Sequence, residues 1–183
     1  MRKTYRPASA TVVVVGSGLL AVFLLGDVFI RGGVAQGLRL TPWVALVVWA
    51  IYATLFAPSV AVDERAIVIA NPLRVTRAPW PAVTDVRLRW QIVVDTTDGR
   101  SVSAFGGPSP GRPARPLRGA RRSEVDEAAR TPASVREAEE IRETWRANVD
   151  APGETSVTTS WNRQVLIPFA VIAAGIALTL ILG

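Results

Sequence analysis

Residues 42–62 read PWVALVVWAIYATLFAPSVAV and contain no charged side chain. A helix of about 20 residues spans roughly 30 Å, which matches the hydrocarbon core of a bilayer. Pro42 and Trp43 stand at the start of this segment, where a first-turn proline and an interfacial tryptophan are expected. The sequence therefore predicts a membrane-spanning helix over residues 42–62.

Two further apolar segments lie on either side of this one. Residues 11–30 carry Asp27 as their only charge, and residues 164–183 carry none. Both are long enough to cross a bilayer, so three membrane-spanning helices are predicted. The predicted soluble segments are a cytoplasmic N-terminus at 1–10, a short external loop at 31–41, a folded module at 63–150 and a linker at 151–163.

Basic residues are distributed unevenly around the predicted spans. The N-terminus carries Arg2, Lys3 and Arg6, whereas the loop between the first two spans carries Arg31 and Arg39. Short segments rich in Lys and Arg stay on the cytoplasmic side. This predicts a multi-pass protein of the inner (plasma) membrane with the N-terminus and the module inside and the C-terminus outside.

A secretory signal peptide is the alternative interpretation of the first apolar segment. The basic N-terminus precedes an apolar stretch, and residues 33–35 (Gly-Val-Ala) supply small side chains for cleavage. A mature N-terminus at Gln36 would establish this alternative by mass spectrometry.

The composition excludes several classes of enzyme. The 183 residues include no cysteine and no histidine, which removes disulfides, zinc-thiolate sites, histidine-ligated metals and Ser-His-Asp triads. We therefore predict no enzymatic activity, no catalytic residue, no metal site and no cofactor. The alternative is a small integral membrane enzyme that uses Asp27 or Glu64 as acid or base.

The module contains a strong strand pattern at residues 86–96 (VRLRWQIVVDT). Its apolar side chains alternate with polar ones, which places the apolar set on one face of a sheet. This set consists of Val86, Leu88, Trp90, Ile92 and Val94. Asp98-Gly99 predicts a tight hairpin of type I′, and residues 100–105 return as a partner strand with Val102 and Phe105 toward the core. A curved antiparallel sheet is the expected arrangement.

The second half of the module predicts a loop and then a helix. Residues 106–122 are rich in proline and arginine, so they are assigned to a loop. A helix is expected over 132–149, with a capping signal at Thr131-Pro132 or Ser134. Its apolar stripe should pack on the sheet. The stripe consists of Val135, Ala138, Ile141, Trp145 and Val149.

Several motifs in residues 62–112 resemble the membrane-anchored bacterial PH-like domain proteins, the actinobacterial low-molecular-weight protein antigen 6 type PH domain family. The motifs that carry the resemblance are Asp63-Glu64, IVIANPLR at 67–74, Pro79-Trp80, Val83, Val86, Asp98-Gly99-Arg100 and GGPSPGR at 106–112. The resemblance implies a PH-like fold, a bent antiparallel sheet closed by a C-terminal helix. The predicted fold class is therefore membrane α with a small α+β module.

The expected function is a non-catalytic interaction module at the cytoplasmic membrane surface that binds a protein partner or a lipid headgroup. Arg74, Arg77, Arg87 and Arg89 are the candidate ligands for anionic headgroups, because guanidinium groups pair with phosphate in bidentate fashion. A solvated, basic sheet face is the simpler interpretation of these arginines. Nucleic-acid binding is not expected, since the arginine-rich stretch 100–122 has Phe105 as its only aromatic residue.

Overall fold

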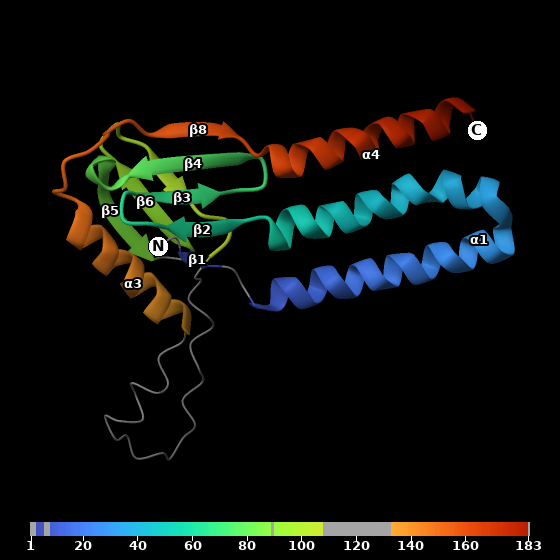
Figure 1. Cartoon of the computed structure of the whole chain (residues 1–183), viewed down its shortest axis with the longest axis horizontal. Coiled ribbons are helices and arrows are strands. Elements are labelled where there is room, and N and C mark those ends of the chain that lie inside the picture. The colour runs from blue at the N-terminus through green and yellow to red at the C-terminus, as the bar shows by residue number, and fades with distance from the viewer. Residues whose placement is uncertain (1–2, 6–7, 89, 108–132, 183) are drawn as a thin grey trace, which may run out of the picture.

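The computed structural model describes residues 3–5, 8–88, 90–107 and 133–182. Most of the predicted loop 106–122, the Thr131-Pro132 cap and Arg89 lie outside the described residues. Figure 1 shows two parts: helices side by side at one end, and strands with one further helix at the other.

The helical part consists of a hairpin and one single helix. Helix α1 (Ala8–Ile51) folds back on itself at Gly33, whose φ of 76° is non-helical. Its second arm continues as the π-helix η1 (Tyr52–Phe56), and α4 (Arg163–Leu182) packs beside that arm. By length and composition, residues 9–56 and Arg163–Leu182 form two helices apolar enough to cross a membrane.

Two predicted boundaries in this part are wrong. The predicted external loop at 31–41 is helical except at Gly33, because glycine alone adopts this positive φ without strain and reverses the chain in one residue. Residues 59–62, predicted as the end of the second span, form a strand instead. Ala57 still has helical φ and ψ, and the helix ends before Pro58, whose ring removes the backbone N–H donor that a further turn would need.

The strands form two antiparallel sheets. The five-stranded sheet has the order β1-β2-β3-β4-β8, with strands β1 (Lys3–Tyr5), β2 (Ser59–Val62), β3 (Ala66–Ala70), β4 (Arg74–Pro79) and β8 (Thr158–Trp161). The three-stranded sheet has the order β5-β6-β7, with strands β5 (Val83–Leu88), β6 (Ile92–Thr96) and β7 (Ser101–Ser103). The short helix η2 (Trp80–Ala82) joins the two sheets.

Both edge strands of the larger sheet come from segments that the sequence left unstructured. Strand β1 precedes the helical hairpin and pairs with β2, which follows it. Strand β8 lies in the predicted linker 151–163 and pairs with β4. Both strands form because a partner strand supplies their hydrogen bonds, which a local sequence pattern cannot reveal. In the signal-peptide alternative, cleavage after Ala35 would remove β1 from the sheet, and with it the buried side chain of Tyr5.

The hairpin between β6 and β7 differs in type from the prediction. Gly99 has a φ of 79°, but no described residue other than glycine has a positive φ. A type I′ turn needs positive φ at both central residues, so Asp98 excludes it. Thr96 N–H donates to the Arg100 carbonyl at 2.9 Å, which encloses a three-residue loop with glycine in the left-handed position.

The core lies between the two sheets and helix α3 (Ala133–Asn148). Trp80 is its largest fully buried side chain, and its Nε1 donates to the Asp63 carbonyl at 2.8 Å. From α3, Ile141 is buried and Trp145 packs against the same cluster. The α3 helix therefore closes the two sheets, as expected of a PH-like fold.

Two residues assigned to the core face are exposed instead. Trp90 is 89% exposed because β5 ends at Leu88 and the chain has already entered the turn to β6. Phe105 is 68% exposed because it lies three positions after Val102, so the period of a strand puts it on the opposite face, and Ala104 is buried in its place. The other members of the alternating set, including Ile92 and Val94, are in the core.

Candidate functional site

The predicted headgroup arginines do not form one patch. Arg74 and Arg77 are both exposed on β4, but positions three apart on a strand point to opposite faces. Arg77 lines a cavity at the far end of the domain together with Glu64 and Glu154. Arg74 lies at the other end of β4, where its guanidinium stands 4.9 Å from the centre of the Trp161 ring.

Arg87 belongs to the second sheet and is already neutralised. Its guanidinium pairs with Asp95 on the neighbouring strand and lies 3.5 Å from Asp85. Two carboxylates around one guanidinium leave no excess positive charge for an anionic ligand. Arg89 lies outside the described residues. Of the three predicted arginines that the structure describes, only Arg74 lies beside the helical part.

Exposed apolar side chains gather where the sheets meet the helical part. Leu73 in the β3–β4 turn is 54% exposed, and Trp161 at the end of β8 is 59% exposed. Phe105 follows β7 on the adjacent sheet. These three residues, with Arg74 and Arg163, are called the proximal rim below. Arginine beside exposed aromatic and aliphatic side chains suits a membrane interface, where apolar bodies enter the lipid and charged heads stay wet.

Asn71 holds the proximal rim together. Its Nδ2 donates to the Ser103 carbonyl at 2.9 Å, and its Oδ1 accepts from Phe105 N–H at 2.8 Å. Its backbone carbonyl accepts from Nδ2 of Asn162 at 3.0 Å, and Asn162 N–H donates to Leu73. Two asparagines thereby tie both sheets to the residue that precedes α4. Asn71 was named only within the motif IVIANPLR, and this connecting role was not predicted from the sequence.

A second polar cluster joins the N-terminal strand to α3. Glu140 accepts from Lys3 Nζ at 2.5 Å and from the Tyr5 hydroxyl at 3.0 Å. These two donors lower the pKa of Glu140 below its ordinary value, and the carboxylate raises the pKa of Lys3. Burial, with the same carboxylate, raises the pKa of Tyr5. The cluster is structural, since it fixes β1 to the helix that closes the core.

The acids proposed for the enzyme alternative lie apart. Asp27 forms an ion pair with Arg31 one turn along α1, at 2.6 Å. Glu64 lies in the β2–β3 turn of the sheet domain. Among the described residues, no group of three or more acidic side chains is arranged to hold a metal. The geometry therefore brings no acid-base pair together from these two residues.

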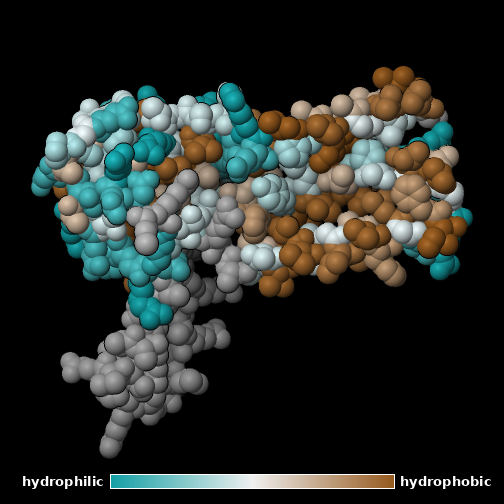
Figure 2. Space-filling view, in the orientation of Figure 1, coloured by the Kyte–Doolittle hydropathy of each residue, from teal (hydrophilic) through white to brown (hydrophobic). Residues whose placement is uncertain are grey.

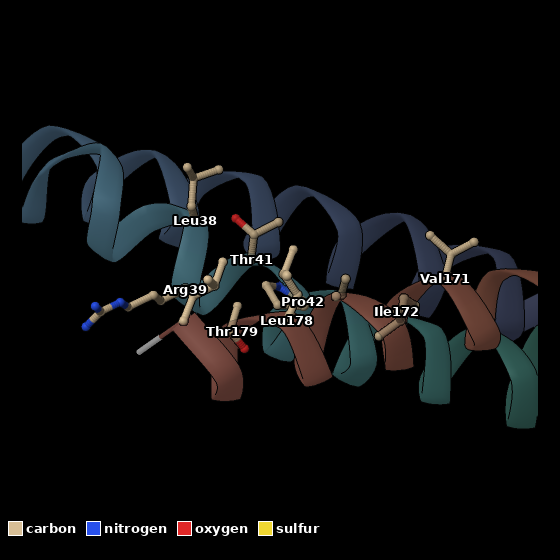
Figure 3. Close-up of a pocket in the computed structure, with 11 residues that line it drawn as sticks. Leu38, Arg39, Thr41, Pro42, Val171, Ile172, Leu178 and Thr179 are labelled. Carbon is tan, nitrogen blue, oxygen red and sulfur yellow. The ribbon is translucent and has the colours of Figure 1, made fainter.

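An apolar crevice of about 550 Å³ lies between the second arm of α1 and α4 (Figure 3). Pro42 and Thr41 face Ile172 and Leu178 across it, while the Arg39 side chain extends away from it. Such a crevice between helices is what lipid chains or neighbouring side chains fill in a bilayer.

Residues 57–109 match the family described as Bacterial PH domain. The matched region runs from just before β2 to just after β7, so it contains both sheets except β1 and β8. This region of the chain is therefore similar to a bacterial PH domain, which confirms the PH-like part of the resemblance inferred from the sequence motifs. No curated protein and no solved structure matches the chain.

Proposed function

We propose that this protein is a non-catalytic PH-like interaction module anchored in the inner membrane, held with its proximal rim against the cytoplasmic surface, where it binds a protein partner or a lipid headgroup. The observation that carries this proposal is the position of the rim. Its exposed apolar side chains, Leu73, Phe105 and Trp161, lie at the end of the domain from which the helices leave.

The surface of the helical part supports membrane anchoring. Apolar side chains on α1 and α4 point outward, among them Phe23, Ile30 and Leu180. Figure 2 shows this apolar surface over the helices and a hydrophilic surface over the sheets. Exposure of this large apolar surface to water would cost free energy, whereas the hydrocarbon core of a bilayer would cover it.

The connections between strands and helices support a fixed orientation. Tyr5 and Ala8 are separated by two residues, as are Phe56 and Ser59, and Asn162 alone lies between β8 and α4. Connections this short let the domain neither rotate freely nor move away from the helices. The sheet and the helical part therefore act as one body at the membrane.

The same connections support the predicted topology. Because β1 pairs with β2, both ends of the hairpin lie at the sheet domain, and three membrane crossings follow if each arm and α4 span the bilayer. The N-terminus and the module then share one side. An alkaline phosphatase fusion after Asp150 should be inactive and a fluorescent reporter there should be bright, and an active phosphatase would contradict a cytoplasmic module.

Site-directed spin labelling tests the position of the rim, because the chain has no cysteine of its own. A nitroxide on Leu73→Cys, in full-length protein reconstituted in liposomes, should collide more with oxygen than with a water-soluble nickel complex. The same label on Thr97→Cys, in the exposed β6–β7 loop, should show the opposite preference. Equal accessibility at both positions would rule out contact between the rim and the bilayer.

A further inference from the structure

A groove of about 650 Å³ lies between the outer face of the five-stranded sheet and the ends of the helices. Ser59 on β2 and Ser160 on β8 line its sheet side, and Tyr52, Arg163 and Gln164 line its helix side. This sheet groove opens where η1 ends and α4 begins. If the helices span the bilayer, this level is that of the lipid headgroups.

The sheet groove contains hydrogen-bond donors and positive charge that can bind an anion. Asn162 precedes α4, and its carbonyl accepts from Val165 and Leu166, so the N–H groups of Arg163 and Gln164 come before the first intrahelical bonds. The positive end of the helix dipole lies at the same point. The exposed Arg163 side chain forms no ion pair with any described residue.

A hydroxyl from the sheet lines the groove opposite the helix. Ser59 is only 7% exposed, and its register on β2 puts its side chain on the outer face with Ala61, opposite the core residues Val60 and Val62. Its hydroxyl has no hydrogen-bond partner among the residues that the structure describes. No buried side-chain polar atom of the described residues lacks a partner, so the unpaired Ser59 hydroxyl reaches the groove and offers a donor there.

We propose that the sheet groove binds the phosphate of an anionic membrane phospholipid, with Arg163 as the paired cation and Ser59 and the first N–H groups of α4 as donors. Trp161 lines the same groove and contributes an aromatic wall at the interface. Arg74 stacks on this ring and adds positive charge nearby. This assignment rests on the proposed membrane anchoring and replaces the four arginines expected from the sequence.

The ligand is assigned to the lipid rather than to a soluble phosphate because of the neighbouring surfaces. The helix side of the groove continues into α4, whose outward side chains are apolar, such as Ile167 and Val171. A phospholipid would place its headgroup in the groove and its chains along these side chains. A soluble phosphate would use only the polar half.

Native mass spectrometry of the full-length protein in dodecyl maltoside tests the assignment, with palmitoyl-oleoyl phosphatidylglycerol as the probe. Wild-type protein should retain one phosphatidylglycerol. Arg163→Gln should bind it about tenfold more weakly, since a charge-assisted hydrogen bond contributes that much. Ser59→Ala should also weaken binding, by a smaller factor. Arg77→Gln removes the same charge from an exposed position outside the groove and should bind as wild type.

Three results would overturn the assignment. These are retention of the lipid by Arg163→Gln as by wild type, loss of as much affinity by Arg77→Gln as by Arg163→Gln, and displacement of the lipid by inorganic phosphate at equal concentration. The first result removes the site, the second indicates diffuse charge attraction, and the third indicates a soluble ligand. None of these results changes the spin-label accessibilities at Leu73 and Thr97, so failure of this assignment is distinguishable from failure of the anchoring proposal.

Discussion

The side-chain amide of Asn162 donates a hydrogen bond to the backbone carbonyl of Asn71 at 3.0 Å, across 91 residues of sequence. Asn71 in turn binds Ser103 and Phe105 through its own amide. These contacts connect the β3–β4 turn, the end of β7 and the start of α4. The orientation of the sheet domain on its helices therefore depends on two amide side chains.

Asn71→Ala should destabilise the protein more than any other asparagine replacement in the sheet domain. The variant leaves the Ser103 carbonyl and the Phe105 N–H without their partner, at about 1–3 kcal/mol for each group that stays buried. The unfolding temperature of full-length protein in detergent should fall accordingly. Asn148→Ala is the matched control, because its amide binds only Thr144 within α3. Equal shifts for the two variants would contradict a connecting role for Asn71.

Stability should depend on pH through Glu140. Hydrogen bonds from Lys3 and Tyr5 lower the pKa of Glu140 below 4.5, so their stabilising effect is present above pH 4.5 and is lost as the pH falls through the lowered pKa. The pKa of Lys3 is raised above 10.5, so its contribution is present below pH 10.5 and is lost as the pH rises further. The cluster therefore stabilises the fold between these limits.

Glu140→Gln tests this window. The difference in unfolding temperature between wild type and Glu140→Gln should be greatest near pH 7 and should shrink below pH 4.5. The difference is expected to be small, because Lys3 and Glu140 are largely exposed. Glu143→Gln on the same helix is the matched control for the loss of one exposed carboxylate. A difference that stays constant from pH 3 to pH 7 would show that Glu140 acts through packing alone.

The sequence predicted elements whose pattern is local. The alternation at 86–94 identified core residues of β5 and β6, but it predicted one strand where the structure has two antiparallel strands. The apolar stripe of α3 identified Ala138 and Ile141, which are buried. The sequence did not reveal β1 and β8, which are short, largely polar strands that form only against β2 and β4. Trp80 was named only as part of a motif, yet it is the largest fully buried side chain of the core.

The candidate site was harder to predict than the fold. Four arginines near one another in sequence were predicted as ligands for anionic headgroups, yet the period of a strand already separates Arg74 from Arg77. The sheet groove depends on Ser59, which was assigned to a membrane helix, and on Arg163, which was assigned to a linker. Their proximity follows from the pairing of β2 with β3, β3 with β4, and β4 with β8, which is not a local property.

Gly106→Ala should destabilise the domain through a backbone clash. A Cβ on Gly106 would lie 2.3 Å from the Pro58 carbonyl oxygen, and backbone atoms at this junction have little freedom to move. The cost should be about 1–3 kcal/mol, as for other overpacking changes. Gly153→Ala is the control, since the nearest atom to its Cβ is 3.8 Å away. Urea titrations of both variants should separate them, and equal midpoints would show that the Pro58 junction can relax.

Trp49→Phe should loosen α4 from the helical hairpin. Trp49 Nε1 donates to the Val165 carbonyl at 2.9 Å, and its ring stacks on Phe169 with 4.6 Å between ring centres. Phenylalanine keeps an aromatic ring but removes the donor, so about 0.5–1.5 kcal/mol of stability should be lost. Trp43→Phe, on an exposed position of the same arm, should have a smaller effect. Thermal unfolding in detergent measures both variants.

A double-mutant cycle then separates ring stacking from the hydrogen bond. Trp49→Ala and Phe169→Ala should each destabilise the protein, and the double variant should lose less than the sum, by about 0.5–1.5 kcal/mol. Asn162 alone separates β8 from α4. The contact between Trp49 and Phe169 therefore also fixes the position of Arg163 beside the sheet groove. Weaker phosphatidylglycerol retention by Trp49→Ala than by Trp43→Ala would show that helix packing positions the groove, and equal retention would show that the sheet alone does so.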